Sequence, residues 1–167
     1  MGCVEKNNAE IVIERTLPEQ IEALCELSVK AWQPVFDERV RLLGKELYDC
    51  FFSEWKEAKK KDIERNLREN IGYTALVNGE IAGFMIYIRD NASKTAIIDA
   101  LAVDPEYGGL GIGTKLCLYV KEQMKKDGMM YAVVTTGLDD AHAPARHTYE
   151  KMGFEKGLPS VKYFMNL

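Results

Sequence analysis

The chain has 167 residues, of which 47% are apolar and 29% are charged, and its formal net charge is −4. This length favours a single domain over residues 1–167 with a real hydrophobic core, and the composition excludes disordered and collagen-like chains. No apolar run approaches the roughly 18 residues that span a bilayer, and the polar start has no secretory signal, so we expect a cytoplasmic protein. The acidic balance argues against nucleic acid as a partner, and we expect no membrane partner either.

The cysteines neither pair at metal-ligand spacing nor form a disulfide pattern, since they are scattered at Cys3, Cys25, Cys50 and Cys117. We therefore expect free thiols in a reducing compartment and no metal site. The start, Met1-Gly2-Cys3, is similar to an acylation signal. However, Lys6 stands where that signal needs Ser or Thr, so we expect no lipid.

The first half of the chain predicts one strand followed by helices. Residues 11–17 alternate like a strand, and a helical apolar spacing follows until Pro34, which is expected to end that helix. Residues 45–70 are again helical in pattern and increasingly charged. Their basic run, Lys59-Lys60-Lys61, lies among acidic residues, which favours a solvated helix face over a nucleic-acid site.

A β-hairpin and a buried strand come next. Asn78-Gly79 separates two alternating runs, and this dipeptide favours the tight turn that joins antiparallel strands. Residues 95–103 are almost continuously apolar, which is typical of a central strand buried on both faces. A single acidic residue, Asp99, interrupts this run.

The second half alternates helices and strands around a glycine-rich loop at Gly108–Gly113. We predict helices over 114–126 and 144–152, with Gly153 as a left-handed stop. Strands are predicted over 131–135, 154–155 and 161–165. The complete order predicts a mixed α/β fold.

The loop at Gly108–Gly113 is suited to bind a phosphate or pyrophosphate. Glycines let the backbone approach a ligand, and the following helix offers unpaired N–H groups with a partial positive charge. A P-loop is excluded because Thr114-Lys115 reverses the required order. A dinucleotide fingerprint is excluded because Thr114 occupies its third glycine position.

Two segments resemble the motifs of the GNAT family of N-acetyltransferases. Residues 101–113 resemble motif A of that family, and residues 145–154 resemble its A-x-x-x-Y-E-K-x-G-F signature, at the family's usual separation. The resemblance implies a mixed, mostly antiparallel central sheet of about 6–7 strands, with helices on both faces and splayed central strands, as in the acyl-CoA N-acyltransferase fold.

The resemblance also implies acetyl-CoA as the acetyl donor, with no metal. The family's cofactor contacts fall on the strand residues Leu101, Ala102 and Val103 and on the loop residues Gly108, Gly109, Leu110, Gly111, Ile112, Gly113 and Thr114. The sequence departs from the family at two positions. Gly108 replaces a Gln or Arg near the phosphates, and His142 stands where Asn is common.

The candidate catalytic residues are Tyr149, Asp99 and His142. The family's matching tyrosine protonates the departing thiolate, and the alternative for Tyr149 is a packing role in its helix. Asp99 is a candidate base, directly or through a water, because a carboxylate on a central strand is costly unless it faces a polar cleft. His142 has a suitable intrinsic pKa and follows Asp139-Asp140, although a simple loop or capping role is the alternative.

The sequence thus predicts an N-acetyltransferase that uses acetyl-CoA and accepts a primary amine on a small molecule or a protein. The acidic net charge favours a cationic amine as acceptor. Trp32, Phe36, Tyr48 and Trp55 are candidates for its pocket, although aromatic residues at helical spacing are more often core. The alternative function is a non-catalytic CoA-binding or regulatory module, and a homodimer is possible by analogy with the family.

Overall fold

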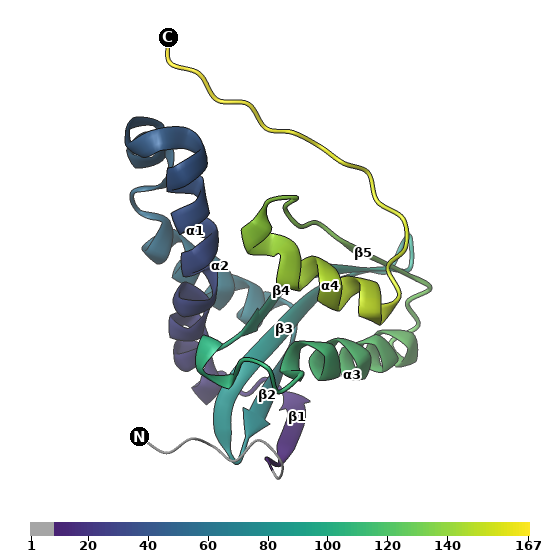
Figure 1. Ribbon diagram of the computed structural model, residues 1–167. Helices are drawn as coiled ribbons and strands as arrows, with labels where there is room; N and C mark the ends of the chain where they lie inside the picture. The colour runs from purple at the N-terminus through teal and green to yellow at the C-terminus, as the bar shows by residue number, and fades with distance from the viewer. Residues whose placement is uncertain (1–8) are drawn as a thin grey trace.

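A computed structural model describes residues 9–167, so the acylation-like start at Met1-Gly2-Cys3 lies outside the described residues. The chain folds into a five-stranded sheet in the order β1-β2-β3-β4-β5 (Figure 1). The first four strands are antiparallel to their neighbours, and β4 and β5 are parallel. The strands are β1 (Ile11–Arg15), β2 (Ile71–Val77), β3 (Glu80–Asp90), β4 (Thr95–Val103) and β5 (Tyr131–Val134).

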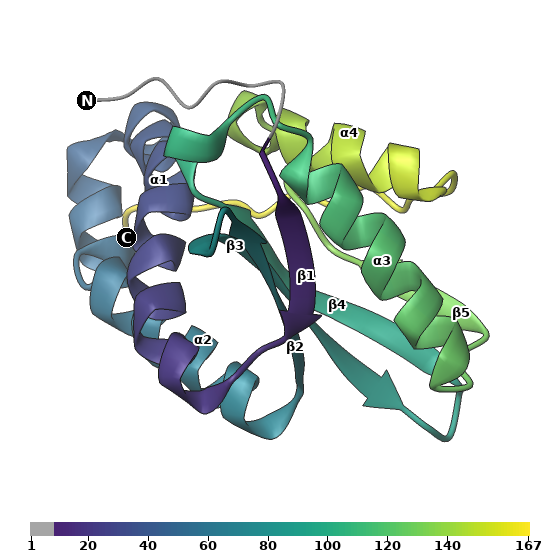
Figure 2. The ribbon, with the colours of Figure 1, turned by 90° about the horizontal axis from the view of Figure 1, so that it is seen from below.

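Helices cover both faces of this sheet, as predicted (Figure 2). One face packs against α1 and α2, with buried residues such as Leu24, Ile63 and Phe84 in one apolar cluster. The other face packs against α3 and α4 through a second cluster that includes Leu116 and Met152. The helices are α1 (Ile21–Phe52), α2 (Trp55–Glu69), α3 (Ile112–Lys126) and α4 (Ala143–Met152).

The predicted hairpin is confirmed by the turn between β2 and β3. Asn78 and Gly79 both have positive φ angles, of 50° and 86°, and both central residues of a type I′ turn need this conformation. Gly153 ends α4 with a φ of 110°, which confirms the predicted left-handed stop.

Pro34 does not end the first helix, so that prediction was wrong. Helix α1 continues through Pro34 and is broken only at Gly44, whose φ of 75° and ψ of 162° are not helical. Proline removes one backbone N–H, but the residues that follow it, Val35 and Phe36, are buried. Their packing outweighs the lost hydrogen bond, and the ring of Phe36 stacks on that of Trp55 at 3.9 Å.

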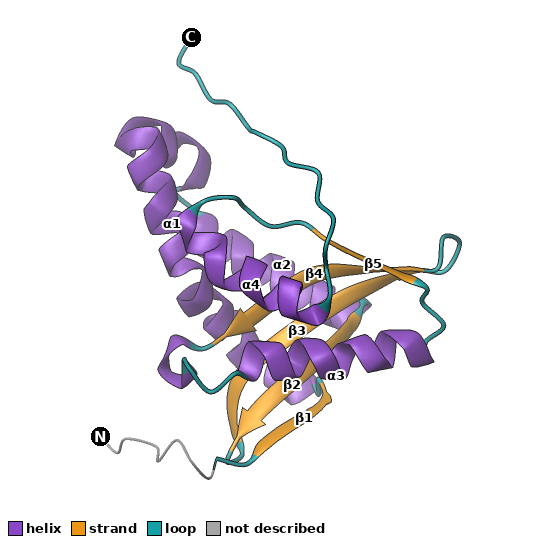
Figure 3. Cartoon of the chain, turned by 45° about the vertical axis from the view of Figure 1, so that its right-hand side comes forward, coloured by secondary structure: helices purple, strands orange, loops and turns teal. Residues whose placement is uncertain are grey.

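The sheet has five strands rather than the predicted six or seven, because the segments at 154–155 and 161–165 form no strand. After α4 the chain runs as an extended loop away from β5 and towards α1 (Figure 3). There the ring of Phe164 packs against Phe51 and Phe52, with centroid distances of 5.2 and 6.1 Å. A strand needs a neighbour for its N–H and C=O groups, and this course takes the segment away from the sheet.

Candidate active site

A cleft opens where the two parallel strands β4 and β5 separate. Their pairing runs from Thr95 and Tyr131 to Ile98 and Val134, after which β4 continues alone to Val103. The edge of β4 that faces β5 therefore keeps unpaired backbone groups beyond Ile98. The cavity there has a volume of about 550 Å³. Its lining comes from α1, α2, α3, β4, β5, the loop after β5 and α4, and includes Trp32, Lys59, Asp99, Leu101, Ala102, Val103, Gly113, Thr135, His142 and Tyr149.

Asp99 is the extra residue of a bulge in β4. Ile98 pairs with Tyr87 and Ala100 pairs with Ile86, which leaves Asp99 without a partner on β3. A bulge re-aims a side chain, and here the carboxylate reaches the cleft and accepts a hydrogen bond from Asn66 Nδ2 at 2.8 Å. Partial loss of hydration raises the pKa of Asp99, the nearby Asp62 adds to this, and the bond from Asn66 opposes it.

Tyr149 lies on α4 and lines the same cleft. The side chain is only 8% exposed, and its ring packs edge-on against Phe154 with a centroid distance of 6.0 Å. Burial raises the pKa of Tyr149 well above its ordinary value, so the phenol keeps its proton at neutral pH. Its hydroxyl makes no hydrogen bond with any residue of 9–167, yet it is not sealed from the cleft.

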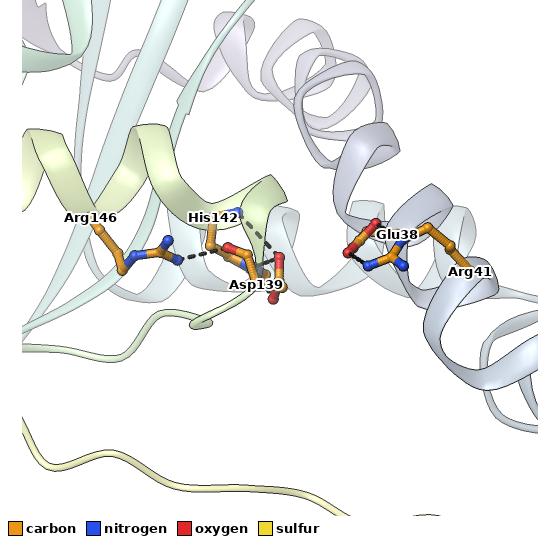
Figure 4. Close-up of polar contacts among 5 residues, drawn as sticks. All are labelled: Glu38, Arg41, Asp139, His142 and Arg146. Atoms are coloured by element: carbon orange, nitrogen blue, oxygen red, sulfur yellow. Dashed lines mark hydrogen bonds and ion pairs between the residues drawn. The ribbon is translucent and has the colours of Figure 1, made fainter.

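His142 is held at the rim of the cleft by Asp139 (Figure 4). Its Nδ1 lies 2.7 and 2.8 Å from the two carboxylate oxygens of Asp139. A carboxylate only accepts, so Nδ1 is the donor, and in the tautomer that this contact selects the lone pair lies on Nε2. Burial raises the pKa of Asp139, but the hydrogen bonds from His142 and from the backbone outweigh it, so the net pKa is lowered.

The loop that carries Asp139 is itself fixed by neighbours that the sequence did not single out. Arg146 Nη1 donates to the carbonyls of Gly137 and Asp139 at 2.6 and 2.7 Å. A Cβ at Gly137 would come within 2.5 Å of both Asp139 Oδ2 and His142 Nδ1, so this hydrogen-bonded pair needs a glycine there. Gly137 and Arg146 lie nine residues apart, on either side of the start of α4, and this spacing was the signal in the sequence that could have indicated their contact.

The glycine loop forms an N–H cradle at the start of α3. Gly109 and Gly111 have φ angles of 83° and 70°, a conformation that favours glycine. Gly108 N donates to Pro105 O and Lys115 N donates to Gly111 O. The N–H groups between them, from Gly109 to Thr114, have no acceptor among the described residues. Together with the helix dipole they form a site for an anion.

The predicted cofactor residues divide between the cleft and this cradle. Four of them line the cavity, namely Leu101, Ala102, Val103 and Gly113. The others make the turn into α3 next to Gly113, namely Gly108, Gly109, Leu110, Gly111, Ile112 and Thr114. The N–H cradle thus follows the free edge of β4 directly in the chain. Together they fit an extended ligand with a phosphate group at one end.

The prediction that Lys59 belongs to a solvated helix face was wrong. It points into the cleft, where its Nζ lies 4.4 Å from the centre of the Trp32 ring, and burial lowers its pKa. Its position on α2 depends on how that helix packs, which periodicity does not show. Of the aromatic candidates, Trp32 lines the cleft, whereas Phe36 and Trp55 line a separate cavity of about 640 Å³ and Tyr48 lines neither.

Residues 9–167 contain no group of three or more His, Cys, Asp or Glu side chains arranged to hold a metal ion. Within the same range, no helix combines the length and apolar character that crossing a membrane requires.

Two curated proteins are similar to this chain in sequence. A protein of Bacillus subtilis, S-(2-succino)cysteine N-acetyltransferase, is 28% identical over 139 residues, which cover 80% of this chain and 77% of that protein. N-alpha-acetyltransferase 30 of Schizosaccharomyces pombe is 29% identical over 126 residues, which cover 74% of each chain.

The fold is similar to solved acetyltransferases. The crystal structure of the PaiA N-acetyltransferase from Thermoplasma acidophilum, in complex with coenzyme A, superposes with a TM-score of 0.69 at 21% identity. It covers 87% of this chain and 90% of that one. The family profile described as the acetyltransferase (GNAT) family matches residues 40–154, which include both the glycine loop and Tyr149. The chain therefore belongs to the acetyltransferase (GNAT) family and is an N-acetyltransferase that uses acetyl-CoA.

Proposed function

We propose that the protein moves the acetyl group from acetyl-CoA directly to a primary amine, with Tyr149 as general acid. The observation that carries this proposal is Tyr149, which lines the cleft between β4 and β5 and whose hydroxyl makes no hydrogen bond to the described residues. The amine nitrogen forms a bond to the thioester carbon, and the carbon–sulfur bond then breaks. The leaving sulfur takes the phenol proton, and the proton lost by the amine restores the phenol through solvent.

The N–H cradle and the free edge of β4 would hold the donor. Backbone groups from Gly109 to Thr114 suit the pyrophosphate, and this binding needs no side chain, so Gly108 in place of Gln or Arg does not remove it. Leu101, Ala102 and Val103 offer unpaired backbone groups to the arm that carries the thioester. Fixing donor and acceptor in one cleft lowers the entropic part of the barrier.

Asp99 is the proposed base for the acceptor ammonium, directly or through a water. Asp99 lines the cleft from a bulge, and among residues 9–167 its carboxylate accepts one hydrogen bond, from Asn66, so other lone pairs stay available. His142 is the second candidate, because Asp139 fixes its ring with the proton on Nδ1 and leaves Nε2 as an acceptor. Both lie along the lining of the same cavity as Tyr149.

The acceptor is proposed to be a primary amine on a small molecule or a protein. The names of the two relatives describe acetylation at nitrogen, one of them on S-(2-succino)cysteine. Asp99 and Asp140 both line the cleft and attract an ammonium group, in keeping with the net charge of −4. We also propose that residues 1–167 act as one catalytic domain in the cytoplasm, where Cys25, Cys50 and Cys117 stay reduced.

The test is thiol release from acetyl-CoA across a panel of amines, with mass spectrometry of the products. The proposal expects an amine that gains one acetyl group at the rate of thiol release. Calorimetry with CoA is the parallel measurement. Tight CoA binding without transfer to any amine would instead support a non-catalytic CoA-binding module.

A further inference from the structure

Lys59 brings a positive charge into the cleft without an anion beside it. Its side chain is half-buried, and its Nζ lies 4.4 Å from the centre of the Trp32 ring. Among residues 9–167, no carboxylate oxygen lies within 4.0 Å of this nitrogen, and it makes no hydrogen bond. An ammonium group carries three donors, and the burial of a charge is costly unless those donors find acceptors. Lys59 is therefore suited to bind an anion that is not part of the described chain.

The carboxylates that attract Lys59 are held by other partners. Asp62 pairs with Arg65, and Asp99 accepts its hydrogen bond from Asn66 at 2.8 Å. Burial lowers the pKa of Lys59, and the more distant charges of Asp62 and Asp99 raise it by less, so the net pKa is lowered. Attraction within the described chain thus does not offset the hydration that Lys59 loses.

Arg39 is a second half-buried cation near Lys59, and its charge lowers the pKa of Lys59 further. The Arg39 guanidinium lies over two aromatic rings, 4.3 Å from the centre of Phe36 and 4.8 Å from that of Phe52. Within residues 9–167 it too has no carboxylate oxygen within 4.0 Å, although Asp139 attracts it from farther away. Two like charges repel each other strongly where water is partly excluded, and a nearby anion relieves this repulsion. The pair therefore favours a bound anion next to Lys59.

The position of Lys59 decides from where an anion can reach it. Lys59 lines the catalytic cleft and also the aromatic cavity of about 640 Å³, whereas Arg39 lines neither. Lys59 is thus the cation of the pair that a ligand in the cleft contacts. Asp99 lines the cleft as well, and the charges of Asp99 and Lys59 each shift the pKa of the other group, so the two lie close together. The cleft therefore presents a negative and a positive charge side by side.

We propose that Lys59 binds a carboxylate of the acceptor, so that the acceptor is a free amino acid with its primary amine towards Asp99. The inference rests on the proposed function, since it names the class of amine that this same cleft acetylates. A hydrogen bond between an ammonium and a carboxylate is charge-assisted and is among the stronger polar contacts. A peptide N-terminus has a neutral amide where the amino acid has its carboxylate, so it lacks this contact.

The charge of the surroundings favours a carboxylate over a phosphate at Lys59. Asp99 and Asp140 both line the cleft, and both repel an anion. A single donor cation among these carboxylates suits a group with one negative charge better than a group with two.

Paired acceptors measure the contact at Lys59. Each pair is an amino acid and its carboxamide, such as L-phenylalanine and L-phenylalaninamide, tested across several side chains with acetyl-CoA in excess. We expect Lys59→Met to raise the KM of the amino acids by about 10–100-fold, the range for loss of a hydrogen bond to a charged group, with kcat nearly unchanged. The KM of the carboxamides should stay near the parent value. Each variant is compared on the same amine, so differences in amine reactivity cancel.

Lys61→Met is the matched control. It removes the same charge from the same basic run, but Lys61 is exposed and does not line the cleft, so both members of each pair should keep their parent KM. Lys59→Arg keeps a positive charge and should restore part of the preference for amino acids, which a purely structural role of Lys59 would not produce. Circular dichroism and CoA binding check that each variant is folded and holds the donor.

Calorimetry with the protein–CoA complex tests the contact without acetyl transfer. The parent chain should bind an amino acid at least about 10-fold more tightly than its carboxamide, and Lys59→Met should bind the two equally. The comparison within the parent chain needs no variant, so it tests the proposal even where Lys59→Met does not fold.

The contact at Lys59 and the proposed function fail separately in these experiments. Equal effects of Lys59→Met on amino acids and carboxamides would overturn the carboxylate contact and leave acetyl transfer to amines intact. A parent chain that does not distinguish the members of any pair would overturn it as well. Binding of amino acids that depends on Lys59, without acetylation of any amine, would support the contact and reject the proposed function.

Discussion

Replacing Tyr149 by phenylalanine isolates the proposed proton donor from the fold. The substitution keeps the ring and its edge-on contact with Phe154, and removes a hydroxyl that has no hydrogen bond to the described residues. The free energy of unfolding should therefore change by about 0.5 kcal/mol or less, because no protein hydrogen bond is lost. Urea unfolding measures this change directly.

The expected loss of activity is much larger than the loss of stability. A positioned general acid contributes about 10²–10⁴-fold, so kcat should fall by that factor, which corresponds to about 2.7–5.4 kcal/mol in the barrier. The KM for acetyl-CoA should stay near its original value, because the N–H cradle at Gly109–Thr114 is unchanged. Thiol release under saturating amine measures both quantities.

The pH dependence gives a sharper test of the same role. Burial raises the pKa of Tyr149, so the phenol remains a proton donor through the neutral range. An ordinary thiol has a pKa of about 8.5, and above that pH the leaving thiolate no longer needs a proton. The deficit of Tyr149→Phe should therefore narrow as the pH rises past that value.

Tyr119→Phe, on the outer face of α3, is the matched control and should keep full activity. Equal turnover by Tyr149→Phe and the parent chain at neutral pH would refute the general-acid role.

Four further substitutions test the proposed base, the contact that fixes His142, the glycine loop and the core. Asp99→Asn should lower kcat/KM and remove the acid limb of its pH profile, because the parent loses its base as the pH falls through the raised pKa of Asp99. Asp139→Asn should destabilise the fold at neutral pH. The parent chain has the stabilisation from Asp139 in full above the ordinary carboxyl pKa and loses it as the pH falls through the lowered pKa of Asp139 in the folded state, so the two chains should converge at low pH. Thermal melts at a series of pH values measure this difference. Gly111→Ala should cost about 1–2 kcal/mol in urea unfolding, because its φ is 70° although a Cβ there has open space. Leu116→Ala, at a fully buried site, should cost about 2–5 kcal/mol in the same assay, and an unchanged midpoint would contradict the described core.

Sequence patterns predicted most of the helices, strands and turns, because these elements depend on residues that are close together in the chain. The positive φ angles at Asn78, Gly79 and Gly153 depend on residue type, and the apolar run at Thr95–Val103 predicts a strand with the bounds that β4 shows. The strands predicted at 154–155 and 161–165 failed for the opposite reason. Strand formation requires a neighbour, and alternation of side chains does not show whether one is within reach.

Tertiary packing also decided where α1 ends. Proline is unfavourable inside a helix, yet the burial of Val35 and Phe36 carries α1 through Pro34. The same limit explains Lys59, whose helical neighbours are charged but whose own side chain reaches the cleft over Trp32. A charge pattern along one helix contains no information about what faces it.

The sequence by itself determined the proposed donor half of the site. An acidic chain can still bind a polyphosphate, because the N–H groups from Gly109 to Thr114 depend only on glycine conformations and a helix start. The proposed acceptor half was decided by tertiary structure. The bulge at Asp99, the divergence of β4 from β5 and the position of Lys59 over Trp32 arise from contacts between distant segments. The conformation of a backbone loop depends on neighbouring residues in the chain, whereas the relative position of two side chains from distant segments is set only when the elements pack.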